Sequence, residues 1–282
     1  MSQVTASAPA TTANLGPAFD RLAMAIERRC NVTAEVSDAW HVDHVGIDRP
    51  GDGEPDGVLA AARLVVGDSQ ALRLTVDTSI PIAKGLGSSA AAYVAGAAAA
   101  LRAIGEEAAP DRVFRTATKM EGHADQTAAA VYGGLILIPA EGLPMRLPMH
   151  PSLRPIVAVP ETRLPTAKAR RVIDDTHPHD RVLRTIARVT ALTAGLITGD
   201  PELLAAAHGD EIHEAPRASL SPEVAAMIEV AKRAGALHAA RSGAGPSVIA
   251  FATNETAGVV TGALEEFGAQ VIDGPMDTTG LI

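Results

Sequence analysis

A short segment at residues 80–100 combines residue types that can bind phosphate. It reads IPIAKGLGSSAAAYVAGAAAA, so a lysine, two glycines and two serines stand directly before an alanine-rich stretch. Glycine lets a backbone turn sharply and approach an oxygen closely, and serine hydroxyls can cap a helix or contact phosphate and metal. The free N–H groups at a helix N-terminus attract anions. By glycine content alone, an ordinary N-capped helix is the better interpretation, so the choice depends on the rest of the sequence.

Helices and strands must position this segment. A helix is expected at 88–104, because the alanine-rich run ends at Gly105, a residue type typical of helix C-termini. Apolar patterns predict strands at 3–10, 31–36, 72–76, 133–138, 155–159, 236–240, 248–252 and 270–272. Further helices are predicted at 110–120, with a continuation to 130 after a break, and at 179–198, 201–208, 221–234 and 255–267. Since these elements follow no strict βαβ rhythm, the pattern favours an α+β fold over a doubly wound sheet.

The bulk composition excludes several classes of protein. The chain has 282 residues and a formal net charge of −9, which argues against binding to the phosphate backbone of nucleic acids. A single cysteine excludes an intramolecular disulfide, and no apolar run reaches the ~20 residues that span a bilayer. The N-terminus lacks the pattern of a signal peptide. We therefore expect a cytoplasmic protein with neither nucleic acid nor membrane as a partner.

Three segments in the chain match one family in its order of motifs. They are PATTANLGPAFD at 9–20, PIAKGLGSSAA at 81–91 and SGAGPS at 242–247. Together they resemble the three motifs of the GHMP kinases, which phosphorylate hydroxyl groups of small molecules with ATP. Three matched motifs make coincidence an unconvincing explanation, so the phosphate-binding interpretation is preferred over the plain helix start.

The resemblance implies a two-domain α+β fold with ATP and Mg²⁺ as cofactors. The first domain, 1–150, would be a mixed sheet that carries the phosphate-binding loop and helix, and the second, 151–282, an α/β sandwich; prolines cluster near the boundary. The nucleotide-binding residues implied by the motifs are Pro81, Lys84, Gly85, Leu86, Gly87, Ser88, Ser89, Ala90, Gly243 and Gly245. Metal ligands are expected from Ser88, Ser89 and Glu121.

Further segments resemble the homoserine kinase branch of this family. EGHADQ at 121–126 is followed by YGG at 132–134, and segments near 160–170 and 216–217 resemble parts that hold a substrate carboxylate. Homoserine carries a carboxylate, an ammonium and a hydroxyl group, so its site needs guanidinium donors at one end and acid or amide groups at the other. The residues that the resemblance assigns to substrate are Arg170 and Arg217 at the carboxylate, Asn14 and Asp20 at the other end, and Thr166 and Gln126. The reaction would phosphorylate the side-chain hydroxyl of L-homoserine to O-phospho-L-homoserine, a step of threonine biosynthesis.

The candidate catalytic residues are His123 and Asp125. For His123 two roles stay open: it orients the site, or it is a hydrogen-bonded structural histidine. Two routes stay open: Asp125 accepts the hydroxyl proton as a base, or the hydroxyl attacks directly without one. The partner is a small amino-alcohol substrate, and a homodimer is one option for the assembly.

Several positions depart from the branch pattern. Gln126 stands where an asparagine is usual, Ala18 where a glycine is usual, and an asparagine near Gly57 is missing. Arg115 occupies the position, eight residues before the histidine, of a glutamate that helps to hold Mg²⁺ in this branch. We therefore expect either a weak Mg²⁺ dependence with a raised metal requirement, or a shifted ligand such as Glu121. Two alternatives therefore remain: a GHMP kinase for another alcohol, such as an isoprenoid alcohol or a sugar, or a catalytically silent homologue with a binding or regulatory role.

Overall fold

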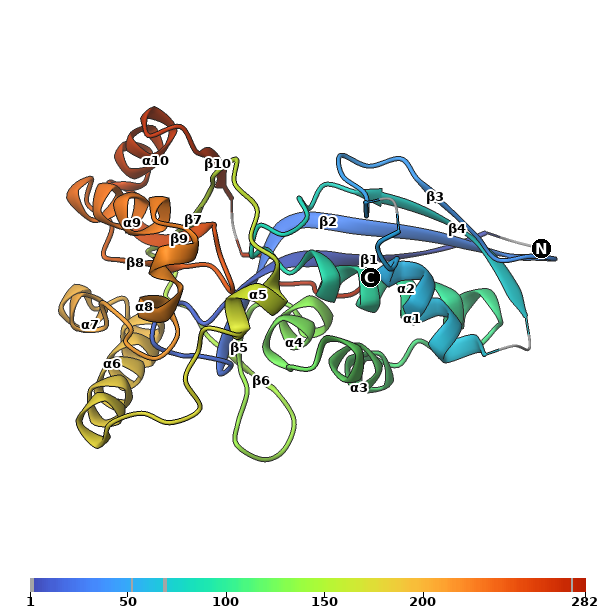
Figure 1. Ribbon diagram of the computed structural model, residues 1–282, viewed down its shortest axis with the longest axis horizontal. Coiled ribbons are helices and arrows are strands. Elements are labelled where there is room, and N and C mark those ends of the chain that lie inside the picture. Colours follow the sequence, from blue (N-terminus) through green and yellow to red (C-terminus); the bar gives the residue numbers. More distant parts are fainter. Residues whose placement is uncertain (1–2, 52, 68–69, 275) are drawn as a thin grey trace.

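The first half of the chain builds a mixed β-sheet (Figure 1). The computed structural model describes residues 3–51, 53–67, 70–274 and 276–282. Within these residues the sheet consists of β1 (Val4–Ala13), β2 (Leu22–Ser37), β3 (His41–His44), β4 (Ala71–Thr78), β5 (Leu135–Leu137) and β6 (Met145–Leu147). The strand order is β3-β4-β2-β5-β6, and β1 also pairs with β2. Strands β3 and β4 run parallel, whereas the other pairs are antiparallel, so the predicted mixed sheet is confirmed.

Helices cover one face of this sheet (Figure 1). They are α1 (Gly57–Val66), α2 (Ser88–Ala103), α3 (Pro110–Glu121) and α4 (Asp125–Tyr132). Alanines make up most of α2, and their small side chains allow its buried face to pack closely on both the sheet and α1. The two helices approach closely at Gly96, where a Cβ atom would lie 2.7 Å from the carbonyl oxygen of Val58 in α1. This dense packing fixes the N-terminus of α2, the end that carries the serines.

The second half is a sheet between two layers of helices. Strands β7 (Leu153–Val159), β8 (His238–Arg241), β9 (Val248–Thr253) and β10 (Gln270–Asp273) are antiparallel in the order β10-β7-β9-β8. Successive side chains of β9 point to opposite faces of the sheet. Positions 248, 250 and 252 pack with α9 (Glu223–Arg233) and α10 (Ala257–Glu266). Positions 249 and 251 share a core with leucines of α6 (His179–Thr198) and the following helix α7 (Pro201–Ala206). The predicted α/β sandwich is therefore confirmed.

Short elements and the chain end join the two halves. Helix α5 (Thr166–Arg170) lies between them (Figure 1), and α8 (Glu214–Arg217) continues into the 3₁₀ helix η1 (Ala218–Leu220). After β10 the chain returns to the first half, where Ser7 and Ile282 exchange two backbone hydrogen bonds of 2.9 Å. The division into 1–150 and 151–282 stays a prediction, although each of the two sheets lies within one of these ranges. None of the described helices combines the length and hydrophobicity that a membrane-spanning helix requires.

Candidate active site

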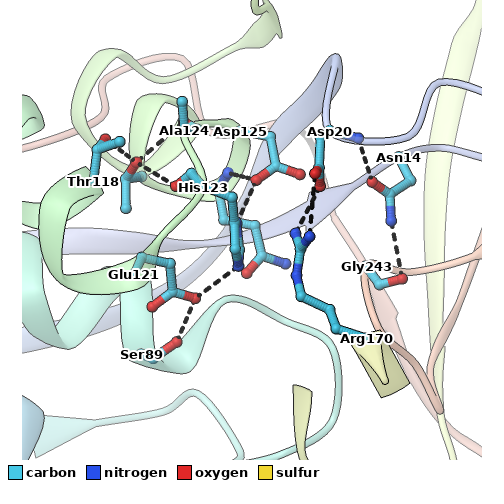
Figure 2. A network of polar contacts seen from close by, with 12 residues as sticks. Asn14, Asp20, Ser89, Thr118, Glu121, His123, Ala124, Asp125, Arg170 and Gly243 are labelled. Carbon is cyan, nitrogen blue, oxygen red and sulfur yellow. Dashed lines mark hydrogen bonds and ion pairs between the residues drawn. The ribbon is translucent and has the colours of Figure 1, made fainter. Parts of the chain in front are cut away.

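A polar cavity of about 200 Å³ is lined by residues of both halves. The predicted site residues that line it are Asn14, Asp20, Gly85, Gly87, Ser88, Ser89, His123, Asp125, Gln126, Thr166, Arg170, Arg217 and Gly243. Figure 2 shows how several of them point toward one another from separate segments of the chain. Among the predicted residues, Pro81, Lys84, Leu86, Ala90, Gly245 and Glu121 are not part of this lining.

The N-terminus of α2 opens onto the cavity. Gly87 directly precedes the helix and has a φ of +65°, a left-handed conformation that glycine adopts without a Cβ penalty. The first N–H groups of any α-helix have no partner within the helix, and they carry its positive dipole end. Because Gly85, Gly87, Ser88 and Ser89 line the cavity, these donors lie at its wall. The segment thus has the features that an anion-binding site needs.

The three sequence motifs meet at this helix start. The turn at 242–247 connects β8 to β9, and its Ser242 donates a hydrogen bond of 2.8 Å to the carbonyl oxygen of Gly85. A Cβ atom on Gly85 would lie 2.3 Å from the carbonyl oxygen of Ser242, so this position requires glycine for space. Asn14 of the first motif donates from Nδ2 to the carbonyl oxygen of Gly243, at 3.1 Å. The motifs therefore form one contiguous wall.

Gly87 gives a direct test of this packing. A Cβ atom there would lie 1.9 Å from Oγ1 of Thr11 in β1, and the residue would have to keep its positive φ. We expect Gly87→Ala to lower the free energy of unfolding by about 2 kcal/mol in chemical denaturation, because strain and collision add. Gly105 is the matched control: its φ is +79° and a Cβ would meet nothing within 4 Å. Gly105→Ala should therefore cost only about 1 kcal/mol.

If Gly87→Ala destabilises the protein through the collision with Thr11, removing the Thr11 hydroxyl should restore part of the stability. Thr11→Ala in the Gly87→Ala background should recover part of the lost stability, since Oγ1 is the colliding atom. Equal losses in the two glycine variants and no rescue would contradict the clash. A side chain at Gly87 also strikes the sheet, so such variants do not report on phosphate binding alone.

Lys84 does not supply a mobile cation to the phosphate site. Its ammonium group donates to the carbonyl oxygens of Pro160, Glu161 and Thr162, at 2.5–2.8 Å, and the residue is buried. The ammonium group is therefore not free in this arrangement, and a contact between Lys84 and nucleotide stays a prediction. The physical reason is that three carbonyl oxygens after β7 satisfy all three donors of the ammonium group. Lys84 instead ties the loop before α2 to the loop before α5.

A chain of polar contacts leads from α2 to α4 (Figure 2). Ser89 donates to Oε1 of Glu121 at 2.8 Å, and the same oxygen lies 3.6 Å from Nε2 of His123. Nδ1 of His123 contacts Oδ1 of Asp125 at 2.8 Å. Burial raises the pKa of the Glu121 carboxyl group. Burial lowers the pKa of the His123 imidazole, but the hydrogen bond and charge of Asp125 outweigh this, so its pKa is raised overall.

Arg115 does not lie at the site. It is exposed on α3, and it is not among the residues that line the cavity. The structure therefore does not place Arg115 beside the residues that are predicted to hold Mg²⁺, and the effect of this departure on the metal requirement stays a prediction. Glu121 is the C-terminal residue of α3. The helix ends at Gly122, with a φ of +85°, and the Glu121 side chain turns toward Ser89.

The loop after β1 is strained and presents Asp20. Asn14, Leu15 and Asp20 have φ values of +69°, +51° and +56°, which cost energy for residues other than glycine and often mark functional sites. Oδ1 of Asn14 accepts from the backbone N–H of Asp20 at 3.0 Å. The Asp20 carboxylate then accepts two hydrogen bonds from Arg170 of α5, at 2.7 and 3.2 Å. This fork-shaped pair joins residues 150 positions apart.

Arg217 is 1% exposed, and three acceptors hold it in α8. Nε donates to the carbonyl oxygen of Ala169 at 3.0 Å, and Nη1 contacts Nδ1 of His213 at 2.9 Å and the Gly243 carbonyl oxygen at 3.3 Å. Burial, with the charges of Arg241 and Arg170, lowers its pKa to about 10, so it stays charged at neutral pH.

Two residues next to Arg217 were missed by the sequence analysis. His213 precedes Arg217 by four positions, a spacing that places two side chains on one face of a helix and that was available as a signal. Phe19, in the first motif, stacks on the His213 ring with centroids 5.0 Å apart, and the guanidinium groups of Arg170 and Arg217 lie over its ring at 5.4 and 5.6 Å.

Two sets of residues in the described chain could be considered for a metal ion. Asp20, His123 and Asp125 bring ligand atoms within 4.8 Å of one another, but Asp20 already pairs with Arg170 and His123 with Asp125. Ser89 and Glu121 offer oxygen atoms at the end of α2, where phosphate would bind, and Glu121 is a buried carboxylate. Mg²⁺ prefers a carboxylate together with phosphate oxygens, so this second set fits it.

Comparisons with known proteins agree with the motifs. The model of the GHMP kinases N terminal domain matches residues 57–134, and that of the GHMP kinases C terminal domain matches residues 192–270. A homoserine kinase of Moorella thermoacetica is 37% identical over 255 residues, covering 86% of this chain and 85% of the relative. A homoserine kinase of Thermus thermophilus is 37% identical over 248 residues, with coverages of 86% and 85%. The crystal structure of a homoserine kinase from Cytophaga hutchinsonii superposes with a TM-score of 0.88 at 26% identity, covering 100% of this chain and 97% of that one.

Proposed function

Because the chain belongs to the GHMP kinase family and is a small-molecule kinase, we propose that it phosphorylates the side-chain hydroxyl of L-homoserine with ATP. The observation that carries the proposal is the pairing of guanidinium and carboxylate groups around one small cavity. A sugar or a simple alcohol has no charged groups that could pair with a guanidinium and a carboxylate, whereas an amino acid carries the complementary carboxylate and ammonium groups. The relatives named as homoserine kinases, which match most of the chain, support the same substrate.

The carboxylate of the substrate would bind Arg217 and Arg170. Among the described residues, Nη2 of Arg217 has no hydrogen-bond partner, so it remains available in the cavity lining. Arg170 is occupied by Asp20. A zwitterion can insert into this pair, with its carboxylate at Arg170 and its ammonium at Asp20. Each buried charge then keeps a partner, which avoids the high cost of an unpaired ion.

The phosphates of ATP would lie at the N-terminus of α2. Ser88 and Ser89 also line a neighbouring hollow, together with Pro50, Gly57 and Tyr93. We place the base of ATP in this hollow, because its apolar and aromatic walls suit a flat ring. The phosphates then reach residues 85–89, and the substrate hydroxyl approaches from the polar cavity on the other side of the serines. This arrangement supports in-line attack on the γ-phosphorus.

Transfer of the phosphoryl group depends mainly on positioning and on charge. Both hydrogen bonds that the Asp125 carboxylate accepts in the described structure go to Oδ1, from His123 and from the backbone of Gln126. Figure 2 shows the second oxygen of Asp125 turned away from His123 and into the space between Asp125 and Asp20. We assign Oδ2 to the substrate hydroxyl, as its orienting acceptor and as the acceptor of its proton. Mg²⁺, held by Ser88, Ser89 and Glu121, would neutralise charge on the phosphates.

A panel of matched alcohols tests the proposed function. ATP turnover would be measured in a coupled assay with four alcohols. L-Homoserine carries both charged groups, and 3-amino-1-propanol lacks the carboxylate. 4-Hydroxybutanoate lacks the ammonium group, and galactose lacks both. We expect kcat/KM for homoserine to exceed the values for the others by about tenfold or more, since a charge-assisted contact contributes roughly 1.5–3 kcal/mol.

Other outcomes of the panel would overturn the proposal. Equal use of homoserine and 3-amino-1-propanol would show that Arg170 and Arg217 do not form a carboxylate clamp, that is, a pair of guanidinium groups that binds the substrate carboxylate. Preferred use of galactose would identify a sugar kinase. Binding of ATP by calorimetry without turnover of any alcohol would indicate a catalytically silent homologue.

A further inference from the structure

His213 is a buried histidine that the chemistry described so far does not use. It lies just before α8, is 0% exposed, and bridges the two halves of the molecule. Its Nε2 atom lies 2.7 Å from the carbonyl oxygen of Gly16 in the first motif, and its Nδ1 atom lies 2.9 Å from Nη1 of Arg217. A side chain with both ring nitrogens engaged in this way sets the relative position of the groups that it joins.

The chemistry of the two partners determines which nitrogen carries the proton. Arginine has donors and no acceptor, so Nδ1 must accept from Nη1 of Arg217. A carbonyl oxygen can only accept, so Nε2 must carry a hydrogen and donate it to Gly16. The ring is therefore the neutral Nε2–H tautomer. Burial, together with the charges of Arg217 and Arg241, lowers the pKa of His213 to about 4 despite the nearby Asp210, consistent with a neutral ring.

The contact at Nδ1 decides where the free nitrogen of Arg217 points. A guanidinium group is planar, so two fixed contacts at different nitrogens define its plane. Nε is fixed by the carbonyl oxygen of Ala169 and Nη1 by His213 and, more distantly, by Gly243. The stack of Phe19 on the His213 ring, tilted by 20°, restricts rotation of the ring itself. With these contacts in place, Nη2 remains the donor that a substrate carboxylate can use.

We infer that His213 is a positioning residue that sets the specificity for a carboxylate substrate by orienting the guanidinium group of Arg217. The inference rests on the proposed function. It assigns no contact between His213 and substrate, because His213 is absent from the cavity lining and acts through Arg217. Its effect should therefore appear in the binding of the carboxylate and not in the transfer step.

Two conservative variants separate the two contacts of the ring. The amide oxygen of asparagine branches from the same carbon as Nδ1 of histidine, so His213→Asn keeps an acceptor for Arg217 and loses the reach to Gly16. The amide of glutamine extends to the position of Nε2, so His213→Gln keeps a donor to Gly16 and loses the acceptor for Arg217. For His213→Gln we expect the KM for homoserine to rise about fivefold, the loss of roughly one net hydrogen bond. For His213→Asn it should stay within about twofold.

Controls distinguish orientation from general damage. In both variants, kcat, the KM for ATP and kcat/KM for 3-amino-1-propanol should stay within about twofold of wild type, because none of them involves the carboxylate clamp. Equal increases in the homoserine KM for the two variants, or an equal loss with 3-amino-1-propanol, would overturn the inference and leave His213 with a purely structural role.

A measurement without substrate separates this inference from the proposed function. In protein with ¹⁵N-labelled histidine, the His213 resonances, assigned by their loss in His213→Asn, should show the neutral Nε2–H tautomer at pH 7. A charged ring or the Nδ1–H tautomer would overturn the inference whatever the substrate. If the tautomer is as expected and wild type does not use homoserine, the proposed function fails while the orientation of Arg217 stands.

Discussion

Replacing Glu121 by glutamine is expected to lower kcat by about 10²–10³-fold and to raise the Mg²⁺ concentration needed for half-maximal activity. Glutamine has the same shape and can still accept the hydrogen bond from Ser89, which is 2.8 Å long. What it removes is the negative charge beside the N-terminus of α2, where the phosphates would lie. Groups that stabilise charge in the transition state commonly contribute this much to the rate. Activity measured against Mg²⁺ at fixed ATP is the test.

Two control variants show whether the effect belongs to this position. Arg115→Glu places an acid on the exposed face of α3 and should leave the Mg²⁺ requirement unchanged. Glu107→Gln removes an exposed acid elsewhere and should also have no effect. A lower Mg²⁺ requirement in Arg115→Glu, or an unchanged one in Glu121→Gln, would move the metal site away from Glu121.

The same variant should also change the pH dependence of stability. Burial raises the pKa of Glu121 above its ordinary value of 4.5, so the ionised carboxylate destabilises the folded state. This penalty is present above the raised pKa and disappears as the pH falls below the unfolded value. At pH 7, Glu121→Gln should therefore be at least as stable as wild type, and the two should converge near pH 4. Chemical denaturation at both pH values checks this; a less stable variant at pH 7 would contradict it.

Replacing Arg217 by lysine is expected to raise the KM for homoserine by about 10–100-fold. Lysine keeps the positive charge but loses the planar fork, so it cannot hold Ala169, His213 and a carboxylate at the same time. Each charge-assisted contact that is lost costs roughly 1.5–3 kcal/mol, and 1.4 kcal/mol corresponds to a factor of ten. The KM for ATP should stay within about twofold, because nucleotide would bind on the far side of the serines.

A substrate that lacks a carboxylate shows whether Arg217→Lys weakens carboxylate binding or damages the structure of the protein. For 3-amino-1-propanol, Arg217→Lys should behave like wild type, and Arg28→Lys, on the surface, should behave like wild type with both substrates. Arg170→Lys should act in the same direction as Arg217→Lys. A similar loss with both substrates in Arg217→Lys would mean that the arginine supports the structure of α8 and does not bind the carboxylate.

Much of the fold follows from local patterns in the sequence. The helix at 179–198 has the predicted bounds, because its apolar period and the glycine at 199, with a φ of +73°, are both local signals. The apolar run at 248–252 predicted a strand, and the structure places its two faces against different helix layers. The helix after Gly87 and its glycine-marked start were also predicted from neighbouring residues.

Other elements were decided by distant partners. The first part of β2, at 22–30, was not predicted as a strand, since its stability comes from pairing with β1 and β5. Helices α1, α5 and α8 and strands β3 and β6 also went unpredicted; all of these except α1 are too short to show a clear period. Their conformations depend on neighbours that lie far away in the sequence.

The site shows the same division. The sequence by itself determined which residue types are present and that three motifs of one family occur in order, and most of these residues line one cavity. It did not determine the direction in which each long polar side chain points. Lys84 points to carbonyl oxygens 76–78 positions away, Asp20 meets Arg170 across 150 positions, and Arg217 is oriented by a histidine tied to Gly16 across 197 positions. Spacing sets the side of a helix or strand on which a residue lies, but a long polar side chain turns toward the nearest unsatisfied partner, and only the tertiary structure decides which partner that is.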